Sequence, residues 1–446
     1  MVKLEGRQVA TVALVSEPFM GNAELTADSA GLPGLPKARL RTSALSNLSA
    51  EEIRRAVEPA LEEVVSGLTV PLPARDAVRH EAPGREASEV FQAADGLSAW
   101  DSMNEAYLEY GWGDGFPLVP PTQQRVDELL RTTRRDPEEV VAILEPGMGL
   151  ATVRKIAINA VMAGCLPKHQ PLPILIAAVK ALTDPKLLYR VISASTGPHA
   201  PMMVINGPIR KKIGLNCEGG ALGPGAKSHT NTVLGRALRL IMMNIGHTYL
   251  GVGDMDTIGT PNKYSMCLGE NEERNPWGPY HVERGYGPQE NTVTVFGVES
   301  QLEIFDLQND TPEGILQTFA GTIPCVGSCS TRYWLYSERW ADNCILMSPD
   351  HASAIAAHGW SKEDIKYYLY EHATLPARFY KNTVEKMRTR PGNRWVYEAD
   401  DSRLLPIAGA HDWFHIVVVG GAAGKSSYTT GTGKAITVKI EDERSA

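Results

Sequence analysis

The chain has 446 residues, of which 43% are hydrophobic and 22% are charged, and this length predicts two or three globular domains. A formal net charge of −8 without long Lys/Arg runs argues against nucleic acid as a partner, and no apolar stretch reaches the roughly 18 residues that a membrane-spanning helix needs. Six cysteines are too few for a disulfide scaffold, so we expect a cytoplasmic protein with reduced thiols and no membrane partner.

The first seventy residues predict a small α/β unit. The continuous apolar run at residues 8–15 is typical of a buried strand, and a helix is expected from about Asn22. Residues 32–48 are rich in Gly, Pro and Ser and predict a loop. A Ser/Glu capping box predicts a helix over 49–68, which Pro59 should kink. One strand and two helices cannot bury a sheet alone, so we expect an incomplete unit whose other strands come from elsewhere.

Residues 71–98 are polar and charged and predict a linker to a larger domain at 99–446. In that domain the patterns predict helices at 100–110, 125–132, 137–143, 151–164, 171–184, in the second half of 214–246, at 312–320 and at 350–375. They predict strands at 201–206, 291–298, 415–419 and 435–440. Strands interleaved with helices indicate a mixed α/β domain, and an α/β protein as a whole.

A glycine-rich loop before the helix of residues 214–246 is a candidate anion site. Its five glycines allow a ligand to approach the backbone, and the start of the helix offers N–H groups and a positive dipole end. A substrate carboxylate or phosphate would fit beside Gly220, Gly223, Lys227 and His229. The alternative is a turn that only packs the helix on a sheet.

Cys217 lies in the same loop. A thiol near a helix N-terminus has a lowered pKa, so Cys217 is a candidate nucleophile. The alternative is a small packing residue without reactivity.

The segment from Cys267 to Gly285 carries many ionisable groups between Gly and Pro residues that prevent one continuous helix. Glu270, His281 and Glu283 are candidate catalytic residues that transfer protons. Together with Asp254, Asp256 and Glu273 they could instead form an oxygen-rich site for a divalent metal. A surface cluster of salt bridges is the structural alternative.

Residues 415–434 resemble a phosphate-binding loop after a strand, but the glycine spacing is one residue short of that motif. A backbone nest that binds a carboxylate or phosphate with Lys425 and Ser426 is one interpretation. A hairpin with two glycine-rich turns is the other.

Several long motifs resemble known bacterial proteins. TVALVSEPF, GLPGLP and LSAEEIRRA resemble the second half of the small proteins named for a UGSC motif, which contains selenocysteine or cysteine. Residues 105–435 resemble a larger family associated with them, in the motifs GWGDGFPLVPPT, GMGLATVRKIAINAVMAGCLP, STGPHAPMMVINGPIR, GGALGPG, GRALRLI, GENEERNPWGPYHVERG, HASAIAAHGWSKEDI and VVVGGAAGKSS.

The UGSC-type motif itself should precede the strand at 8–15, where this chain has only MVKLEGR. The resemblance therefore implies a split protein in which a small partner subunit supplies the missing strands and the reactive Cys or Sec. By analogy with the UGxC sites of glycine- and proline-reductase-type selenoproteins, it implies thiol-driven reductive cleavage.

The leading hypothesis is a catalytic subunit of a hetero-oligomeric enzyme, an oxidoreductase, that acts on a small carboxylate-bearing substrate. One alternative is a metal-dependent lyase or hydrolase that uses Glu270, His281 and Glu283. The other is a non-catalytic substrate-binding subunit. The cofactor stays unknown, with a divalent metal as one candidate.

Overall fold

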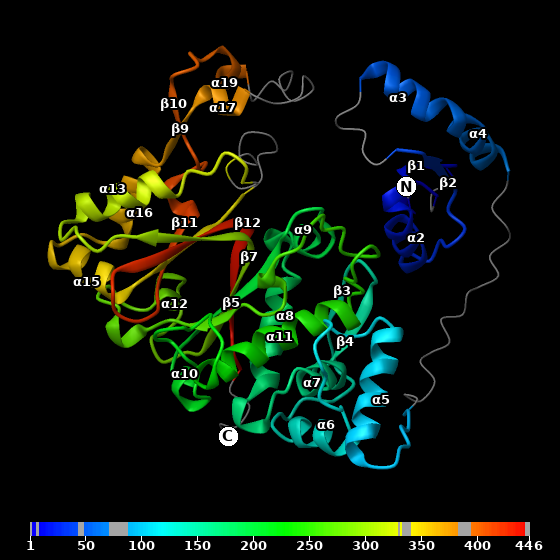
Figure 1. The fold of residues 1–446 in the computed structure, drawn as a ribbon, viewed down its shortest axis with the longest axis horizontal. Helices are drawn as coiled ribbons and strands as arrows, with labels where there is room; N and C mark the ends of the chain where they lie inside the picture. The colour runs from blue at the N-terminus through cyan, green and yellow to red at the C-terminus, as the bar shows by residue number, and fades with distance from the viewer. Residues whose placement is uncertain are drawn as a thin grey trace.

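The computed structural model describes residues 2–5, 9–42, 49–70, 88–328, 331, 340–381 and 394–441. Figure 1 shows a small N-terminal unit and a separate larger domain. Most of the expected linker, residues 71–87, lies outside the described residues. None of the helices in these described ranges has the length and apolar composition that crossing a membrane requires.

The N-terminal unit contains a two-stranded parallel sheet of β1 (Ala13–Ser16) and β2 (Lys37–Leu40), with α2 (Met20–Ser29) between them. The predicted capping box is present at Ser49, where α3 (Ala50–Val57) begins. The 3-10 turn Glu58–Ala60, which contains Pro59, separates α3 from α4 (Leu61–Thr69), as the kink prediction required. Its small core contains Ala38, Leu40 and Ala60.

Two expectations for this unit were wrong. The strand expected over 8–15 begins only at Ala13 and is half exposed, with Leu14 52% accessible. The loop expected over 32–48 contains β2, whose four residues gain their hydrogen bonds from pairing with β1.

The larger domain is built on a six-stranded mixed sheet, which confirms the α/β class. Its strands are β5 (Ala200–Asn206), β6 (Cys267–Gly269), β7 (Thr292–Phe305), β8 (Asn343–Met347), β11 (Phe414–Val418) and β12 (Lys425–Lys439), in the order β11-β8-β12-β7-β5-β6. The outer pairs β11–β8 and β5–β6 are parallel, and the central pairs are antiparallel.

Helices of the larger domain surround this sheet (Figure 1). They are α5 (Gly96–Glu109), α6 (Gln123–Leu130), α7 (Val153–Met162), α8 (Pro171–Leu182), α9 (Tyr189–Ala194), α10 (Ile209–Lys212), α11 (His229–Asn244), α12 (Tyr280–Glu283), α13 (Pro312–Thr322), α15 (Pro349–Ala357), α16 (Lys362–His372), α17 (Ala377–Lys381) and α19 (Arg394–Glu398). Two short antiparallel two-stranded sheets complete the domain, the hairpin β3 (Val140–Leu144) with β4 (Gly149–Thr152) and the pair β9 (Thr374–Pro376) with β10 (Leu404–Pro406).

Residue alternation along the strands divides the core. Met203 and Val295 pack in the core that includes α7, α8 and α11, whereas their neighbours Met202 and Phe296 face the other side of the sheet. Further along the sheet, the residues of β8 alternate between the core under α13, α15 and α16 and that same opposite side. The opposite side carries the smaller core, which leaves room there for a cavity.

Four expectations for the larger domain needed correction. The helical stretch expected at 350–375 is two helices, α15 and α16, followed by β9. The helix expected at 137–143 is β3, because its β-branched residues pair with β4. The strand expected at 291–298 continues to Phe305, where it pairs along nearly all of β12. The strand expected at 435–440 is only the end of β12, which begins at Lys425.

Candidate functional site

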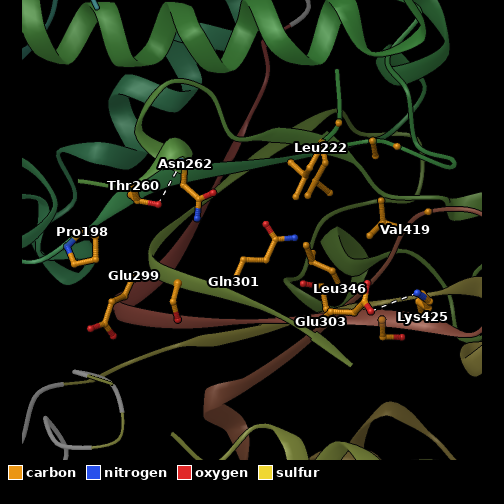
Figure 2. Close-up of a pocket in the computed structure, with 18 of the residues that line it drawn as sticks. Pro198, Leu222, Thr260, Asn262, Glu299, Gln301, Glu303, Leu346, Val419 and Lys425 are labelled. Atoms are coloured by element: carbon orange, nitrogen blue, oxygen red, sulfur yellow. Dashed lines mark hydrogen bonds and ion pairs between the residues drawn. The ribbon is translucent and has the colours of Figure 1, made fainter. Parts of the chain in front are cut away.

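A cavity of about 820 Å³, which we call the sheet cavity, lies against the smaller-core side of the sheet. Its floor includes Leu268 of β6 and Leu346 of β8. Its walls come from three loops, residues 220–223, 259–262 and 419–420, and from polar residues of β7 and β12 (Figure 2).

Two glycine-rich loops that lie some 200 residues apart in the sequence meet at this cavity. The N–H of Gly420 donates a hydrogen bond to the carbonyl of Cys217 over 3.0 Å. A Cβ added at Gly421 would lie 3.2 Å from the Cα of Gly219, closer than most Cβ contacts, so glycine at this position favours the close approach of the two backbones. The contact places Gly220 and Gly223 in the same cavity as Lys425, although the sequence suggested two separate anion sites.

A row of polar side chains on β7 lines the opposite wall and was missed by the sequence analysis. Glu299, Gln301 and Glu303 line the cavity, and Gln301 points toward its middle in Figure 2. Lys425 on β12 pairs with Glu303 over 3.4 Å. The alternation of polar with apolar residues after position 298 was the available signal, since it continues the strand pattern.

Glu299 lies at an irregularity in the pairing of β7 with β12. Val298 pairs with Gly431 and Ser300 with Thr430, so Glu299 is the extra residue of a bulge. Its Oε2 accepts hydrogen bonds from the hydroxyls of Ser328 (3.1 Å) and Thr430 (3.3 Å). Bulges of this kind often re-aim side chains next to active sites.

His199 lies directly behind the cavity wall, next to Pro198, which lines it. The ring is fully buried, and neither ring nitrogen has a hydrogen-bond partner among the described residues. Burial lowers the pKa of His199, although the nearby carboxylate of Glu299 acts in the opposite direction.

Three predicted anion-binding side chains do not face the cavity. The Ser426 hydroxyl hydrogen-bonds the buried His351 Nδ1 over 2.8 Å and accepts a 3.0 Å bond from the N–H of Ser348. The hydroxyl therefore lies on the core side of β12, where Ser426 pairs with Ile304. Ser426 borders the cavity, but its hydroxyl is used in the core. Lys227 and His229 are exposed at the start of α11 and do not line the cavity.

Glu270, a predicted catalytic residue, is fully buried and saturated with hydrogen bonds. Its Oε2 accepts bonds from Asn206 Nδ2 (2.5 Å) and the N–H of Tyr280 (2.6 Å), and its Oε1 accepts one from Asn275 Nδ2 (2.7 Å). Burial raises the pKa of Glu270, and the ammonium of Lys362 offsets part of that rise.

His281 and Glu273 lie around a buried guanidinium. Arg210 donates hydrogen bonds to the carbonyl of Glu270 (2.6 Å), to Glu272 (2.6 Å) and to both oxygens of Glu273 (3.2 Å each). The fully buried His281 bonds the carbonyl of Gly287 through Nε2 over 3.1 Å, which leaves Nδ1 4.0 Å from Glu272. Burial lowers the pKa of His281, against the effect of Glu272.

Glu283 lies on the other side of this cluster. Its carboxylate pairs with the ammonium of Lys362, which is 94% buried, and lies 4.0 Å from Lys366. Lys362 also approaches Glu270 to 4.0 Å. The segment 267–285 is therefore a network of buried and half-buried ion pairs.

The residues predicted to bind metal are neutralised by basic side chains. Asp254 pairs with Arg239 (3.0 Å) and Lys263 (2.8 Å), and Lys263 also pairs with Asp256 (2.7 Å). Glu273 binds Arg210 and Lys211 instead, so the predicted set is divided between two clusters. Within the described part of the chain, no three His, Cys, Asp or Glu residues are arranged to hold a metal ion, so the metal-site prediction has no geometric support.

Cys217 does not have the lowered pKa that the sequence analysis expected. Burial raises the pKa of its thiol, and Arg210, 3.7 Å away, offsets only part of that rise. The sulfur packs against Gly269, where an added Cβ would lie 2.5 Å from it.

Comparisons with known proteins bear on the N-terminal unit. No curated protein matches the chain, and no solved structure matches it. Residues 1–70 match the model described as the UGSC family, which confirms the resemblance that the N-terminal motifs carry.

Proposed function

We propose that this chain is a subunit of a hetero-oligomeric enzyme that acts on a small carboxylate-bearing molecule bound in the sheet cavity. The observation that carries this proposal is the meeting of two glycine-rich loops around Gly219 and Gly421, with Lys425 in the same cavity. Exposed backbone beside a lysine is a common way to bind a carboxylate or phosphate.

The charges of the cavity narrow the class of substrate. Glu299 and Glu303 contribute two negative charges, and Lys425 contributes one positive charge. The net negative charge of the cavity would repel a simple carboxylate. A carboxylate that also carries an ammonium or hydroxyl donor would instead pair with both the lysine and the glutamates. We therefore expect an amino or hydroxy carboxylate, with its carboxylate near Lys425 and its donor group near Glu299.

Glu299 is the better candidate for proton transfer than the residues expected from sequence. It lines the cavity, whereas Glu270 and His281 have no exposed surface through which to reach a substrate. In the proposed reaction, a dithiol of the partner subunit is oxidised to a disulfide while one bond of the substrate is cleaved. The two electrons of the dithiol reduce the cleaved bond, and its two protons end one on each fragment of the substrate. Glu299 provides the proton that the leaving group takes and is reprotonated by one thiol, while the proton of the other thiol goes to the remaining fragment.

The N-terminal unit supports the idea of a partner subunit. Its sheet has only two strands, and isolated two-stranded sheets are marginally stable. Leu14 is 52% exposed, and a shallow groove along α4 contains Leu61, Val65 and Val70, each at least 50% exposed. We propose that the UGSC-type half-domain of the partner adds strands to this sheet and covers these apolar side chains.

A non-catalytic substrate-binding subunit is the second candidate. The saturation of Glu270 and the burial of His281 favour it, because a binding protein needs no accessible acid or base beside its ligand. A lyase or hydrolase remains an alternative only in a form that uses cavity carboxylates rather than the predicted metal set.

Binding measurements test the cavity part of the proposal. We expect glycine and lactate to bind more tightly than acetate or ethanolamine, each of which lacks one of the two groups, as measured by calorimetry. Gly421→Val should weaken this binding at least tenfold because its side chain would push the two loops apart, while Gly321→Ala, in open space on α13, should not. Equal binding of all four compounds would contradict the proposal.

Native mass spectrometry of the complex from its own host tests the partner. A second, small subunit with a UGSC-type motif, lost on Val65→Glu substitution, is the expected result. A homo-oligomer without such a subunit would leave the substrate-binding role as the better account.

A further inference from the structure

A second cavity, of about 400 Å³, lies in the helical part of the large domain, and we call it the helix cavity. It lies between α7, the loop after α5 and the end of α11, which are neighbours in Figure 1. None of its lining residues also lines the sheet cavity, so the two are separate sites. Its volume is within the range of small-molecule pockets.

One face of α7 forms a wall of the helix cavity. Lys155, Ile158, Asn159 and Met162 all line it, and they follow the i, i+3, i+4, i+7 spacing that places residues on one helical face. The apolar members give the wall its shape, and Lys155 gives it a charge.

Hydrogen bonds between amides fix the frame of the cavity. Asn244 donates to Asn159 Oδ1 over 2.7 Å, and Asn159 donates to the carbonyl of Lys155 over 2.9 Å. Asn244 Oδ1 accepts bonds from the Tyr249 hydroxyl (3.0 Å) and from the N–H of Gly113 (3.2 Å). The side-chain amides are thus committed to holding the three elements together, and the cavity is formed before a ligand arrives.

Among the described residues, Lys155 is the one Lys, Arg, Asp or Glu that lines the helix cavity. Lys155 is half-buried, and the described residues provide no ion pair or hydrogen bond to its ammonium group, so its charge is available to a ligand. Burial and the charge of Lys155 lower the pKa of the neighbouring His247, which is therefore neutral at pH 7. The end of α11 at this cavity carries the negative end of the helix dipole, equivalent to about half a charge. This repels an anion less strongly than the full positive charge of Lys155 attracts it.

The remaining walls are apolar and partly aromatic. Tyr107 and Trp112 pack edge to face with ring centroids 5.2 Å apart, and Pro121 and Ile245 lie beside them. Such walls favour a planar apolar body. We propose that the helix cavity binds a small organic carboxylate with an aromatic or similarly flat apolar body, whose carboxylate pairs with Lys155.

Calorimetry on the full chain with benzoate and its neutral analogue benzamide tests this site. Benzoate should bind at least tenfold more tightly than benzamide. Lys155→Met should remove that preference and leave benzamide binding unchanged, whereas Lys212→Met, an exposed lysine of α10, should change neither. Glu299→Gln should also change neither, because Glu299 belongs to the sheet cavity, so a failure here is distinct from a failure of the proposed function.

A second variant separates charge from shape. Ile158→Trp fills the helix cavity and leaves Lys155 itself unchanged, so it should abolish the binding of both compounds while the thermal unfolding transition persists. Equal affinity of the native chain for benzoate and benzamide would overturn the proposal, as would the absence of benzoate binding at millimolar concentration. Should Lys155→Met not fold, Lys155→Gln provides the same comparison of the two compounds.

Discussion

Replacement of Arg210 by methionine tests whether the buried ion network holds the 267–285 segment. The Arg210 side chain is 3% exposed and binds Glu272, which is 12% exposed, over 2.6 Å. Methionine fills a similar volume but leaves this carboxylate without its cation. Breaking a buried ion pair on one side typically costs about 3–5 kcal/mol, which is a large part of the roughly 5–15 kcal/mol that stabilises a folded domain.

The double variant Arg210→Met/Glu272→Gln removes the unpaired charge. We therefore expect it to recover at least half of the stability that the single variant loses. Urea unfolding followed by tryptophan fluorescence measures both, since Trp277 lies within the same segment. Arg274→Met is the matched control, because Arg274 forms a half-exposed pair with Asp350 and such pairs contribute up to about 1 kcal/mol.

Two results would refute this account. A loss from Arg210→Met no larger than the control would mean that the network does not stabilise the domain. A double variant as unstable as the single variant would mean that lost packing, and not the unpaired carboxylate, is the cause.

Three further predictions concern glycine packing, acid stability and thiol reactivity. Gly431→Ala should lower the thermal midpoint, because its Cβ would overlap a backbone carbonyl just before β8, whereas Gly321→Ala, in open space, should not. Burial acts to raise the pKa of Asp306, but hydrogen bonds from Asn and Thr side chains outweigh it and lower the pKa to about 2. Its stabilising contribution is therefore complete above its usual pKa and is lost as pH falls toward 2, and Asp306→Asn should flatten the acid-unfolding curve in that range. Iodoacetamide should modify the exposed Cys325 before Cys217 at pH 7, because burial raises the pKa of Cys217, and peptide mass spectrometry showing the reverse order would contradict this.

Local patterns were sufficient where neighbouring residues determine the structure. The capping box at Ser49 and the break at Pro59 depend on side chains and backbone within one turn, and both were predictable. β2 and β3 were not predictable, because each is stabilised by pairing with another strand. The sequence window around Pro137 fits a short helix as well as a strand, and only β4 decides between them.

The candidate site could be predicted in parts but not as a whole. Each glycine-rich loop was recognisable by itself, whereas their contact at Gly219 and Gly421 depends on the order of the strands. Asp254 and Asp256 resemble metal ligands in sequence because their cations, Arg239 and Lys263, come from other elements. Glu299 was missed because its role follows from a bulge, which is visible only in the register of β7 with β12.

The 267–285 segment is connected directly to the sheet cavity, and this connection affects how variants should be interpreted. The N–H of Asn271 donates to the carbonyl of Val418 over 2.8 Å, and its side chain reaches the carbonyl of Gly420, which lines the cavity. A variant that loosens the network around Glu270 would therefore displace the second glycine-rich loop. Loss of activity in such a variant does not by itself identify a proton-transfer residue.

The pH dependence of activity separates the two roles. If Glu270 only positions the loop, Glu270→Gln and Asn271→Ala should lower activity or ligand affinity by similar factors and leave the shape of the pH profile unchanged. If Glu270 transfers a proton, Glu270→Gln alone should remove one limb of the profile, because the titrating group is absent. The saturation of both Glu270 oxygens by hydrogen bonds favours the first outcome, since a carboxylate that already accepts three bonds would have to break one to reach a substrate.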